Sequence, residues 1–476
     1  MQQRCGISAY GTYLPYWRLD HSTIAEALGG TARGPGARTV AGYDEDTTTM
    51  AVEAARRALG TDTAAAACTG VVLATTAPVY AEKTNATALH AALGLSEEAS
   101  AADANGSVRS GVSALLGAIR QPGATLVAAS DLRIGPGGSP EERSSGDAAT
   151  AFLVGDGLDA GLVAELVGSA SLTREFLDRW RRPEDPWAAT WEERFGEEVY
   201  SDLGARSLAA ALASAGLTPG DVDRIAVVGL SPRAAAAVQR SSGIAKEAAQ
   251  PDLTGTIGNC GAAHPGLALA AMLDDVGPDA VVVLTVLADG ADTLVLRTTA
   301  AHHPQGPTVA AQVGGPTGRV GYADYLSWRG LLRRQQPRRP DPDRAVAPAT
   351  NRQVEWKFSF SASTCEVCGV RHMPPQQVCM GCGTVDRMRL TRLSETKAAI
   401  ATYTVDHLAY SPAPPVIGAV LDFDGGGRFQ CELTDIDLDS LAVGRRVEMT
   451  FRHISDAEGI RNYFWKARPL HEEDQA

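Results

Sequence analysis

Four cysteines near the C-terminal end of the chain have the spacing of a metal site. They lie in the segment CEVCGVRHMPPQQVCMGC and are Cys365, Cys368, Cys379 and Cys382. Two C-x-x-C pairs bring four thiolates into a tetrahedron, and such a closed set leaves no open position for a substrate. The spacing therefore predicts a structural zinc ion rather than a catalytic one. The other four cysteines are scattered, and we expect them to be small buried residues.

A second segment has the pattern of a nucleophile turn. AADANGSVRSGVSALLGAI, residues 101–119, is typical of a strand end, a glycine turn and the first turns of a helix, but it contains no cysteine. A helix N-terminus stabilises an anionic nucleophile, so Ser107 is a candidate if a base lies nearby. The candidate bases are His90 and His264, and His264, five residues after Asn259 in GTIGNCGAAHPG, is the one we pair with Ser107. The alternative is a helix-capping serine and a packed histidine.

Arginines alternate with tryptophans in REFLDRWRRPEDPWAATWEERFG, residues 174–196. The residues of interest are Arg179, Trp180, Arg181 and Arg182. Guanidinium groups bind phosphates and indole rings stack on bases, so this set suits the 3′-phosphate and adenine of coenzyme A. An aromatic insertion that packs on its own domain or on a second subunit is the competing interpretation.

Residues 1–300 alternate apolar strand-like runs with alanine-rich helical stretches, as expected of an α/β protein. The order of strands and helices runs twice, so we expect two similar halves over residues 1–165 and 166–300. Residues 301–355 resemble a linker that carries a docking helix around Tyr322, Tyr325 and Trp328. We expect a zinc ribbon over 356–390. Five short strands over 391–476 predict a small OB-type barrel.

Composition and charge exclude some classes of function. The chain has 476 residues and a formal net charge of −13, which argues against a broad nucleic-acid surface. No run of about 18 apolar residues is present to cross a bilayer, and no signal peptide is recognisable. We therefore expect a cytoplasmic protein without nucleic-acid or membrane partners.

Several motifs resemble the hydroxymethylglutaryl-CoA synthases and the β-ketoacyl carrier-protein synthases III of the thiolase superfamily. These motifs are AYGTYLPYWRL, GYDEDTTTMAVEAARRAL, SDLRIGPGGSPEERSSGDAATAFLVGD and GTIGNCGAAHPGLALAAML. The resemblance implies a duplicated, five-layered thiolase-like fold, acyl-CoA as ligand or substrate, and a homodimer. The last 120 residues resemble zinc ribbons joined to OB folds that accompany thiolases, which implies a thiolase-family partner.

The resemblance also implies a catalytic set of cysteine, histidine, asparagine and glutamate. An ungapped match places Val108 at the cysteine position, and a shift of one residue places Ser107 there. The histidine position falls on Leu230 or Ser231, and the glutamate position falls on Thr76. Asn259 alone matches.

Two hypotheses follow from this departure. In the first, the chain is an acyl-CoA-binding scaffold in an acyltransferase or thiolase-type complex, and its partner supplies the cysteine chemistry. In the second, it is an active acyltransferase, or an enzyme that forms or cleaves C–C bonds, and it uses Asn259 with Ser107 and His264. A regulatory acyl-CoA sensor is a third interpretation.

Overall fold

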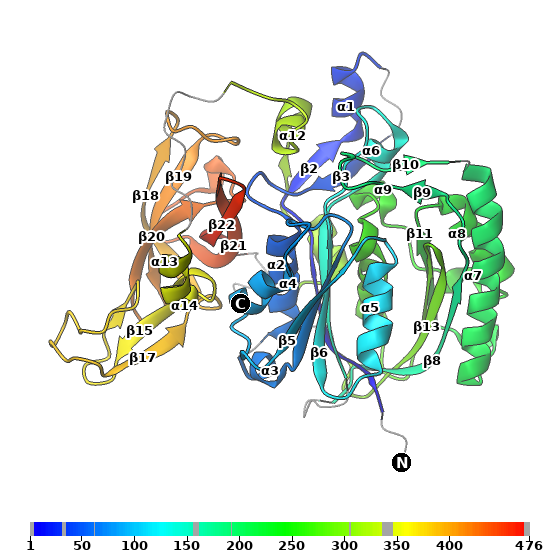
Figure 1. Cartoon of the computed structure of the whole chain (residues 1–476), viewed down its shortest axis with the longest axis horizontal. Helices are drawn as coiled ribbons and strands as arrows, with labels where there is room; N and C mark the ends of the chain where they lie inside the picture. Colours follow the sequence, from blue (N-terminus) through cyan, green and yellow to red (C-terminus); the bar gives the residue numbers. More distant parts are fainter. Residues whose placement is uncertain are drawn as a thin grey trace.

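The fold is taken from a computed structural model that describes residues 4–30, 35–60, 62–155, 161–191, 193–303, 306–335 and 346–470. A nine-stranded mixed sheet forms the body, in the order β11-β12-β13-β8-β1-β7-β6-β4-β5 (Figure 1). Its two halves meet where β1 pairs with β8 over Gly6 and Ile7. The α/β class expected from the alternating pattern is confirmed.

The two halves repeat one strand arrangement. In the first half, β1 and β6 both pair antiparallel with β7, and β6 and β5 both pair parallel with β4. In the second half, β8 and β12 both pair antiparallel with β13, and β11 pairs parallel with β12. In the second half, the position that corresponds to β5 has a single parallel bridge, between Ile225 of β11 and Ala249. The duplication expected from the sequence is therefore present in the strand order.

The central strands β1, β6, β7 and β12 are apolar and almost wholly buried, as strands covered on both faces require. The strands of the first half are β1 (Gly6–Tyr13), β4 (Gly70–Thr75), β5 (Ser100–Asn105), β6 (Ala124–Asp131) and β7 (Ala148–Gly155). Those of the second half are β8 (Ala164–Thr173), β11 (Arg224–Gly229), β12 (Val281–Leu287) and β13 (Gly290–Thr298).

Helices form three layers around these strands (Figure 1). Helices α2 (Thr47–Leu59) and α4 (Ala86–Ala92) cover one outer face, with α3 (Asp62–Ala67) beside them. Helices α5 (Ser110–Ile119) and α10 (His264–Asp275) lie between the two halves, and α7 (Glu193–Ala215) and α8 (Pro232–Ser241) cover the other outer face. Asp46 begins α2, because its side chain accepts hydrogen bonds from the backbone N–H groups of Thr48 and Thr49. The five-layered architecture of the resembled superfamily is thus observed.

Smaller elements lie over the ends of the body. They are the sheet β14 (Gly318–Arg319), β2 (Trp17–Asp20) and β3 (Ala37–Val40), the hairpin β9 (Arg179–Trp180) and β10 (Ala189–Thr190), the α-helices α1 (His21–Ala27), α6 (Pro140–Ser144), α9 (Thr254–Ile257) and α11 (Val309–Gly314), and the 3-10 helices η1 (Pro219–Asp221), η2 (Lys246–Ala248) and η3 (Gly261–Ala263). Helix α12 (Tyr322–Trp328) buries Tyr322 and Tyr325 against β2, β3 and α1. The expected linker lies partly outside the described residues.

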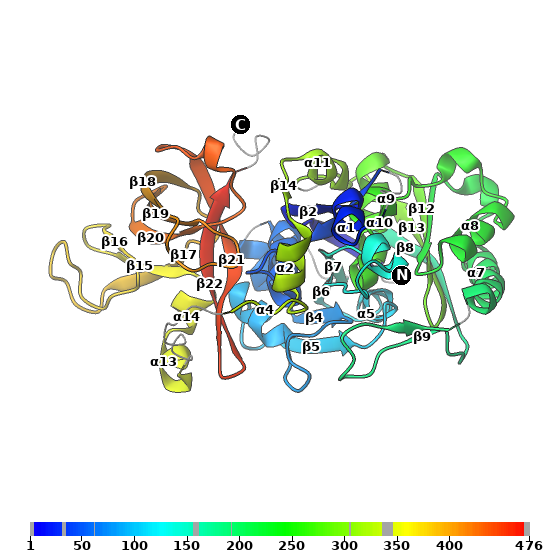
Figure 2. The same cartoon turned by 90° about the horizontal axis from the view of Figure 1, so that it is seen from above.

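The C-terminal part consists of a ribbon and a closed barrel. The ribbon contains β15 (Ser361–Cys365), β16 (Arg371–His372) and β17 (Met388–Arg392). The barrel contains β18 (Ala398–Asp406), β19 (Val416–Phe423), β20 (Arg428–Leu433), β21 (Arg446–Ala457) and β22 (Ile460–Pro469), with η4 (Leu438–Ser440). Helices α13 (Ala347–Arg352) and α14 (Val354–Lys357) precede the ribbon, which projects away from the body (Figures 1 and 2). The predicted five-stranded OB barrel is confirmed.

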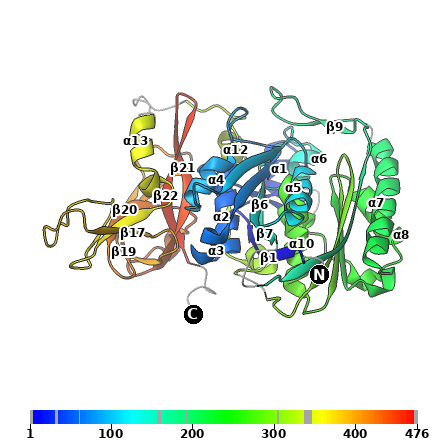
Figure 3. The ribbon, with the colours of Figure 1, turned by 60° about the horizontal axis from the view of Figure 1, so that its bottom comes forward.

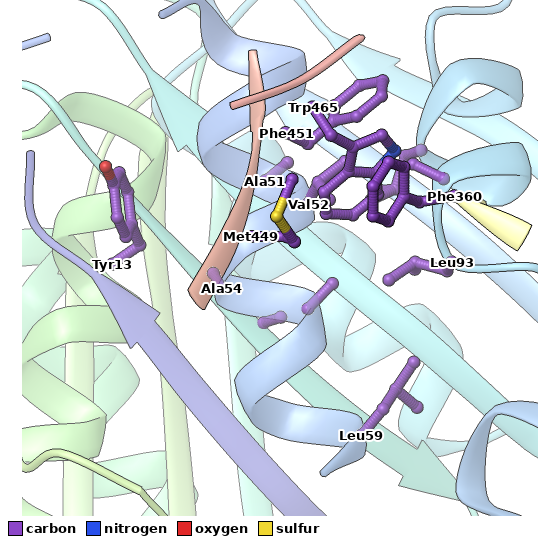
Figure 4. Packing of buried hydrophobic residues seen from close by; sticks show 14 of the residues in the cluster. Tyr13, Ala51, Val52, Ala54, Leu59, Leu93, Phe360, Met449, Phe451 and Trp465 are labelled. Carbon is purple, nitrogen blue, oxygen red and sulfur yellow. The ribbon is translucent and has the colours of Figure 1, made fainter. Parts of the chain in front are cut away.

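The barrel packs on α2 of the body through a shared core. Met449, Phe451 and Trp465 of the barrel lie with Ala51 and Val52 of α2 in one hydrophobic cluster (Figure 4). The barrel lies on the α2 side of the body, while α7 and α8 lie on the opposite side (Figure 3). Because these apolar side chains are buried from both sides, barrel and body form one packed unit. In the part of the chain that the structure describes, no helix combines the length and the apolar character needed to cross a membrane.

Candidate functional site

The candidate site lies where the carboxyl ends of parallel strands meet the starts of two central helices. In the first half, β4 and β6 end at Thr75 and Asp131, and the loop before α5 lies beside them. In the second half, β11 ends at Gly229, and the turn at 259–263 leads into α10. Ligands of open α/β sheets bind at such strand ends. The duplicated fold therefore brings the motifs of both halves to one place.

Asp131 is the buried centre of this place, and the sequence analysis did not identify it. One carboxylate oxygen accepts hydrogen bonds from the Thr75 hydroxyl at 3.1 Å and from both the N–H and the hydroxyl of Thr76 at 2.8 Å. The other oxygen accepts the Ala262 N–H at 2.8 Å. Thr76, at the expected glutamate position, thus positions Asp131. The quoted motif that begins SDLR contained this residue, but its role depends on partners distant in sequence.

Glycine is required next to this carboxylate. A Cβ atom on Gly261 would lie 2.0 Å from an Asp131 carboxylate oxygen, and the φ angle of Gly261 is +56°. Both the space and the left-handed backbone exclude a larger side chain. The turn before α10 is therefore tied to the end of β6.

Asn259 lies in the same turn. Its amide Nδ2 donates to the Gly229 carbonyl at 2.8 Å, and its Oδ1 accepts the Gly261 N–H at 3.0 Å. A primary amide has two N–H groups, and no partner for the second is found among the described residues. The asparagine therefore fixes the turn and keeps one donor for a ligand oxygen.

Ser107 contacts a carboxylate from the other half of the fold. Its hydroxyl donates to Asp289, which lies in the turn between β12 and β13, and it accepts the Arg109 N–H at 3.1 Å. Arg109 reaches Asp292 through two hydrogen bonds, at 2.6 Å and 3.0 Å. Val108, between them, is half-buried. The start of α5 is thus held against β13, a contact between residues about 180 positions apart that no local pattern indicates.

His264 is buried in a different environment. Its Nδ1 accepts the Cys260 N–H at 3.4 Å, and burial lowers its pKa to about 4, so the ring is neutral at physiological pH. Within the described residues, no hydrogen bond joins His264 to Ser107. Cys260 is also buried, and burial raises the pKa of its thiol to about 12. The thiol is therefore protonated and unreactive at neutral pH.

The residues at the expected histidine position, Leu230 and Ser231, have structural roles. The Ser231 hydroxyl accepts the Ala234 N–H at 3.4 Å and begins α8, while Leu230 is half-buried. The Asn259 amide donates to the residue just before them, Gly229. The fold therefore brings Asn259 and the end of β11 together.

The arginine-tryptophan segment forms the β9–β10 hairpin over this site (Figure 3). Arg181 donates to the Thr76 carbonyl at 2.5 Å, which brings the hairpin to the strand ends. Arg179 makes two hydrogen bonds to Glu141, at 3.0 Å and 2.6 Å, and Arg182 pairs with Asp185 on the exposed surface. Burial alone would raise the pKa of Glu141, but Arg133 and Arg179 outweigh it and lower the value to about 2. Arg179 is therefore already paired.

Three tryptophans of the hairpin segment are accessible to solvent, and Trp187 among them is 37% exposed. Trp180 and Trp191 are 37% and 64% exposed, and their rings meet edge to face with centroids 6.3 Å apart. The exposed indoles provide a stacking surface, and Arg181 of the same segment provides a cation at the strand ends.

The four cysteines of the ribbon come together as the spacing predicts. Their sulfur atoms lie within 4.8 Å of one another, with Cys365 and Cys382 3.7 Å apart and Cys368 and Cys379 3.4 Å apart. Four thiolates at Zn–S distances of about 2.3 Å stand about 3.8 Å apart at the corners of a tetrahedron. The observed spacing fits a metal held by four thiolates. The cluster lies in the projecting ribbon rather than at the strand-end site.

Comparisons with known proteins agree with the fold of the body and with the C-terminal OB barrel. The hydroxymethylglutaryl-CoA synthase of Aeropyrum pernix is 30% identical over 302 residues, which cover 61% of this chain and 83% of that protein. The enzyme of the same name from Pyrobaculum neutrophilum is 28% identical over 355 residues and is covered to 98%. A family model described as "ChsH2, C-terminal OB-fold domain" matches residues 391–452.

Solved structures show the same fold. A hydroxymethylglutaryl-CoA synthase complexed with CoA matches with a TM-score of 0.59 at 19% identity, covering 68% of this chain and 90% of that one. The 3-oxoacyl-(acyl carrier protein) synthase III of Pseudomonas aeruginosa matches with a TM-score of 0.54 at 21% identity, covering 62% and 98%. The fold is that of a condensing enzyme-like protein of the thiolase superfamily. Within that class, the chain belongs to the hydroxymethylglutaryl-CoA synthase family and carries an additional ribbon and OB barrel.

Proposed function

We propose that this chain is an acyl-CoA-handling subunit of an acyltransferase or thiolase-type complex, without a cysteine acyl-enzyme of its own. It binds acyl-CoA and acts as a scaffold for a thiolase-family partner that supplies the catalytic cysteine. The start of α5 carries the proposal: Val108 has no nucleophilic atom, and the Ser107 hydroxyl is engaged with Asp289. The buried, neutral ring of His264 has its own partner in Cys260.

The decisive experiment measures covalent acylation. The purified chain is incubated with radiolabelled acetyl-CoA, quenched in acid and counted for protein-bound label. We expect no label on the natural chain and label on Val108→Cys, or on Ser107→Cys if the alignment is shifted by one residue. Because a helix N-terminus lowers the pKa of a thiol, the introduced cysteine has the setting it needs. Label on the natural chain would refute the proposal.

A partner is sought separately. The tagged chain is isolated from its own host, and the proteins that remain bound are identified by mass spectrometry. A stoichiometric thiolase-type protein with an intact cysteine is the expected result. Isolation of the chain alone would favour the second candidate function.

That second candidate is an acyltransferase or an enzyme that forms or cleaves a C–C bond without an acyl-enzyme. The unpartnered Asn259 N–H favours it, since such a donor stabilises a thioester enolate or oxyanion. Removing one such donor typically lowers a rate 100- to 1000-fold. If the chain alone releases CoA from a short acyl-CoA, Asn259→Ala is expected to lose that activity while retaining its melting temperature.

Coenzyme A binding is proposed at the β9–β10 hairpin, with Arg181 and Trp180 as its contacts. Arg181→Gln is expected to weaken CoA binding about tenfold, the effect of losing one charge-assisted hydrogen bond. Arg182→Gln is the matched control, because Arg182 is exposed and already paired with Asp185. Calorimetry of the two variants checks this assignment, and equal affinities would refute it.

The remaining parts of the proposal concern metal, assembly and location. The metal proposed for the four cysteines is structural zinc, which cross-links the two knuckles of the ribbon. A homodimer is supported by β5, which is an edge strand of the nine-stranded sheet in the described residues. The cytoplasm is the proposed location, because reducing conditions keep such thiolates available to a metal.

A further inference from the structure

A groove of about 580 Å³ lies on the C-terminal barrel, and the proposed function does not use it. It is bounded by β20 and β22 on one side and by helices α13 and α14 on the other. Its volume is in the range of small-molecule sites in proteins. The groove therefore has room for a ligand of its own.

Aromatic side chains form its floor. Trp356 of α14 meets Phe429 of β20 at a centroid distance of 5.2 Å and Phe464 of β22 at 5.4 Å. All three side chains are half-buried. Aromatic rings that converge on an open groove provide a surface for an apolar chain or a second ring.

One wall of the groove is an open seam of the barrel. In the described barrel, β20 and β22 share one registered pair, Leu433 with Ala467, and the Thr434 N–H donates to the Ala467 carbonyl. Backbone N–H groups point to the same side of a strand at every second residue, so those of Glu432 and Gln430 also point toward β22. The strands are not paired there. The wall thus offers backbone donors to a ligand.

A cation without a counter-ion stands at the rim. Lys357 lines the groove, its ammonium lies 5.8 Å from the centroid of the Phe358 ring, and no ion pair to a carboxylate is found for it among the described residues. Partial burial lowers its pKa, as expected for a cation without a compensating charge. By contrast, Lys466 is bound to Asp44 at 3.0 Å and Glu432 at 2.8 Å. The ammonium of Lys357 is therefore a positive charge that is available to an anionic ligand of the groove.

We propose that this groove binds a small apolar carboxylic acid, with its chain or ring on Trp356, Phe429 and Phe464 and its carboxylate on Lys357 and the seam N–H groups. The aromatic floor matches the apolar body. Both the ammonium and the backbone donors favour an anionic acceptor over a neutral or cationic end. Cys431 also lines the groove, but burial raises the pKa of its thiol to about 12, so binding there is non-covalent.

The test uses decanoate and its uncharged analogue decanamide, titrated into the full chain by calorimetry at pH 7.5. Decanoate is expected to bind at one site and at least tenfold more tightly than decanamide. Lys357→Gln is expected to remove this preference by weakening decanoate alone. Lys246→Gln, a change at an exposed lysine on η2, is expected to leave both affinities unchanged.

A second pair of variants tests the location without removing core packing. Ala349→Trp places an indole at the lining of the groove and is expected to abolish binding, whereas Ala347→Trp on the same helix lies outside the lining. Equal binding by Ala349→Trp and the natural chain would overturn the proposal, as would equal affinities for decanoate and decanamide. Displacement of decanoate by CoA lacking an acyl group would also overturn it. These results do not depend on whether Arg181 binds coenzyme A, so the two proposals can fail separately.

Discussion

At the scale of single residues, the side chains of the strand-end motifs fix the turns and strand ends around the site. Asp131 joins the ends of β4 and β6 to the turn before α10, and Asn259 joins that turn to β11. The sequence indicated Asn259 as the matching residue of the expected catalytic set, but not its hydrogen bond to Gly229. It gave no sign of the contact between Ser107 and Asp289, because neither residue belongs to a local pattern that includes the other.

The buried histidine makes stability depend on pH. The folded-state pKa of His264 is about 4, below the usual 6.5, so the unfolded chain binds a proton first as the pH falls. The stabilising effect is complete above pH 6.5 and is lost as the pH falls toward 4. Between pH 7.5 and pH 5, the natural chain is expected to lose about 2 kcal/mol more unfolding free energy than His264→Gln. Urea unfolding at both pH values measures this difference.

The exposed His303 provides the control for that experiment. His303→Gln is expected to show the same pH dependence as the natural chain. If His264→Gln also follows the natural chain, the ring is not buried in its neutral form.

At the scale of elements, the periodicity of apolar residues was sufficient to predict those helices and strands that have a regular sequence pattern. The capped helix α2, the strand pair β12–β13 and the five barrel strands all lie where apolar alternation and turn residues indicate. The β9–β10 hairpin and the helices α13 and α14 were not expected as such. They are short, and their positions depend on contacts with other elements rather than on a repeating pattern.

The ribbon provides a prediction about metal. The natural chain is expected to contain about one zinc ion, and Cys365→Ser is expected to lose it, because three thiolates no longer close the tetrahedron. Elemental analysis of freshly purified protein measures the metal content. Cys5→Ser, a change outside the cluster, is expected to retain the ion. Natural protein without metal would contradict the assignment.

Helix α12 is held in place by buried charge. The Asp147 carboxylate pairs with Arg38 at 3.2 Å and with Arg329 at 2.6 Å, and Tyr325 of α12 lies against both guanidinium groups. Asp147→Asn leaves both cations buried without a counter-ion, so we expect a loss of about 3–5 kcal/mol in unfolding free energy. Asp324→Asn breaks only the exposed pair with Arg334 and is expected to cost less than about 1 kcal/mol. Similar losses in the two variants would contradict the role given to Asp147.

At the scale of the whole molecule, the sequence indicated two parts but not the way they join. The interface contains a buried ion pair between Glu53 of α2 and Arg468 of the barrel in addition to its apolar core. Such pairs cannot be recognised in a sequence, because every charged residue on α2 is compatible with a solvated helix face. With the barrel fixed to α2 in this way, the ribbon of β15, β16 and β17 projects away from the body (Figure 2).

Glu53 is the residue on which this interface can be tested. Its carboxylate pairs with Arg56 of α2 at 3.0 Å and with Arg468 of the barrel at 2.9 Å, and it accepts the Phe451 N–H at 3.1 Å. Burial alone would raise its pKa, but the two arginines outweigh burial and lower the value to about 2. The resulting stabilisation is complete above the usual pKa of about 4.3 and is lost as the pH falls toward 2.

Glu53→Gln is therefore expected to lower the unfolding free energy by about 3 kcal/mol at pH 7, since it leaves buried guanidinium groups without their charge partner. The difference from the natural chain is expected to shrink as the pH falls below about 4, because the natural carboxylate is then progressively protonated. Asp422→Asn, which breaks an exposed pair with Arg428 on the barrel alone, is the matched control and is expected to change little. If barrel and body form one cooperative unit, Glu53→Gln lowers a single transition recorded by both tryptophan fluorescence and circular dichroism. Two separate transitions in the natural chain would show instead that the barrel unfolds independently of the body.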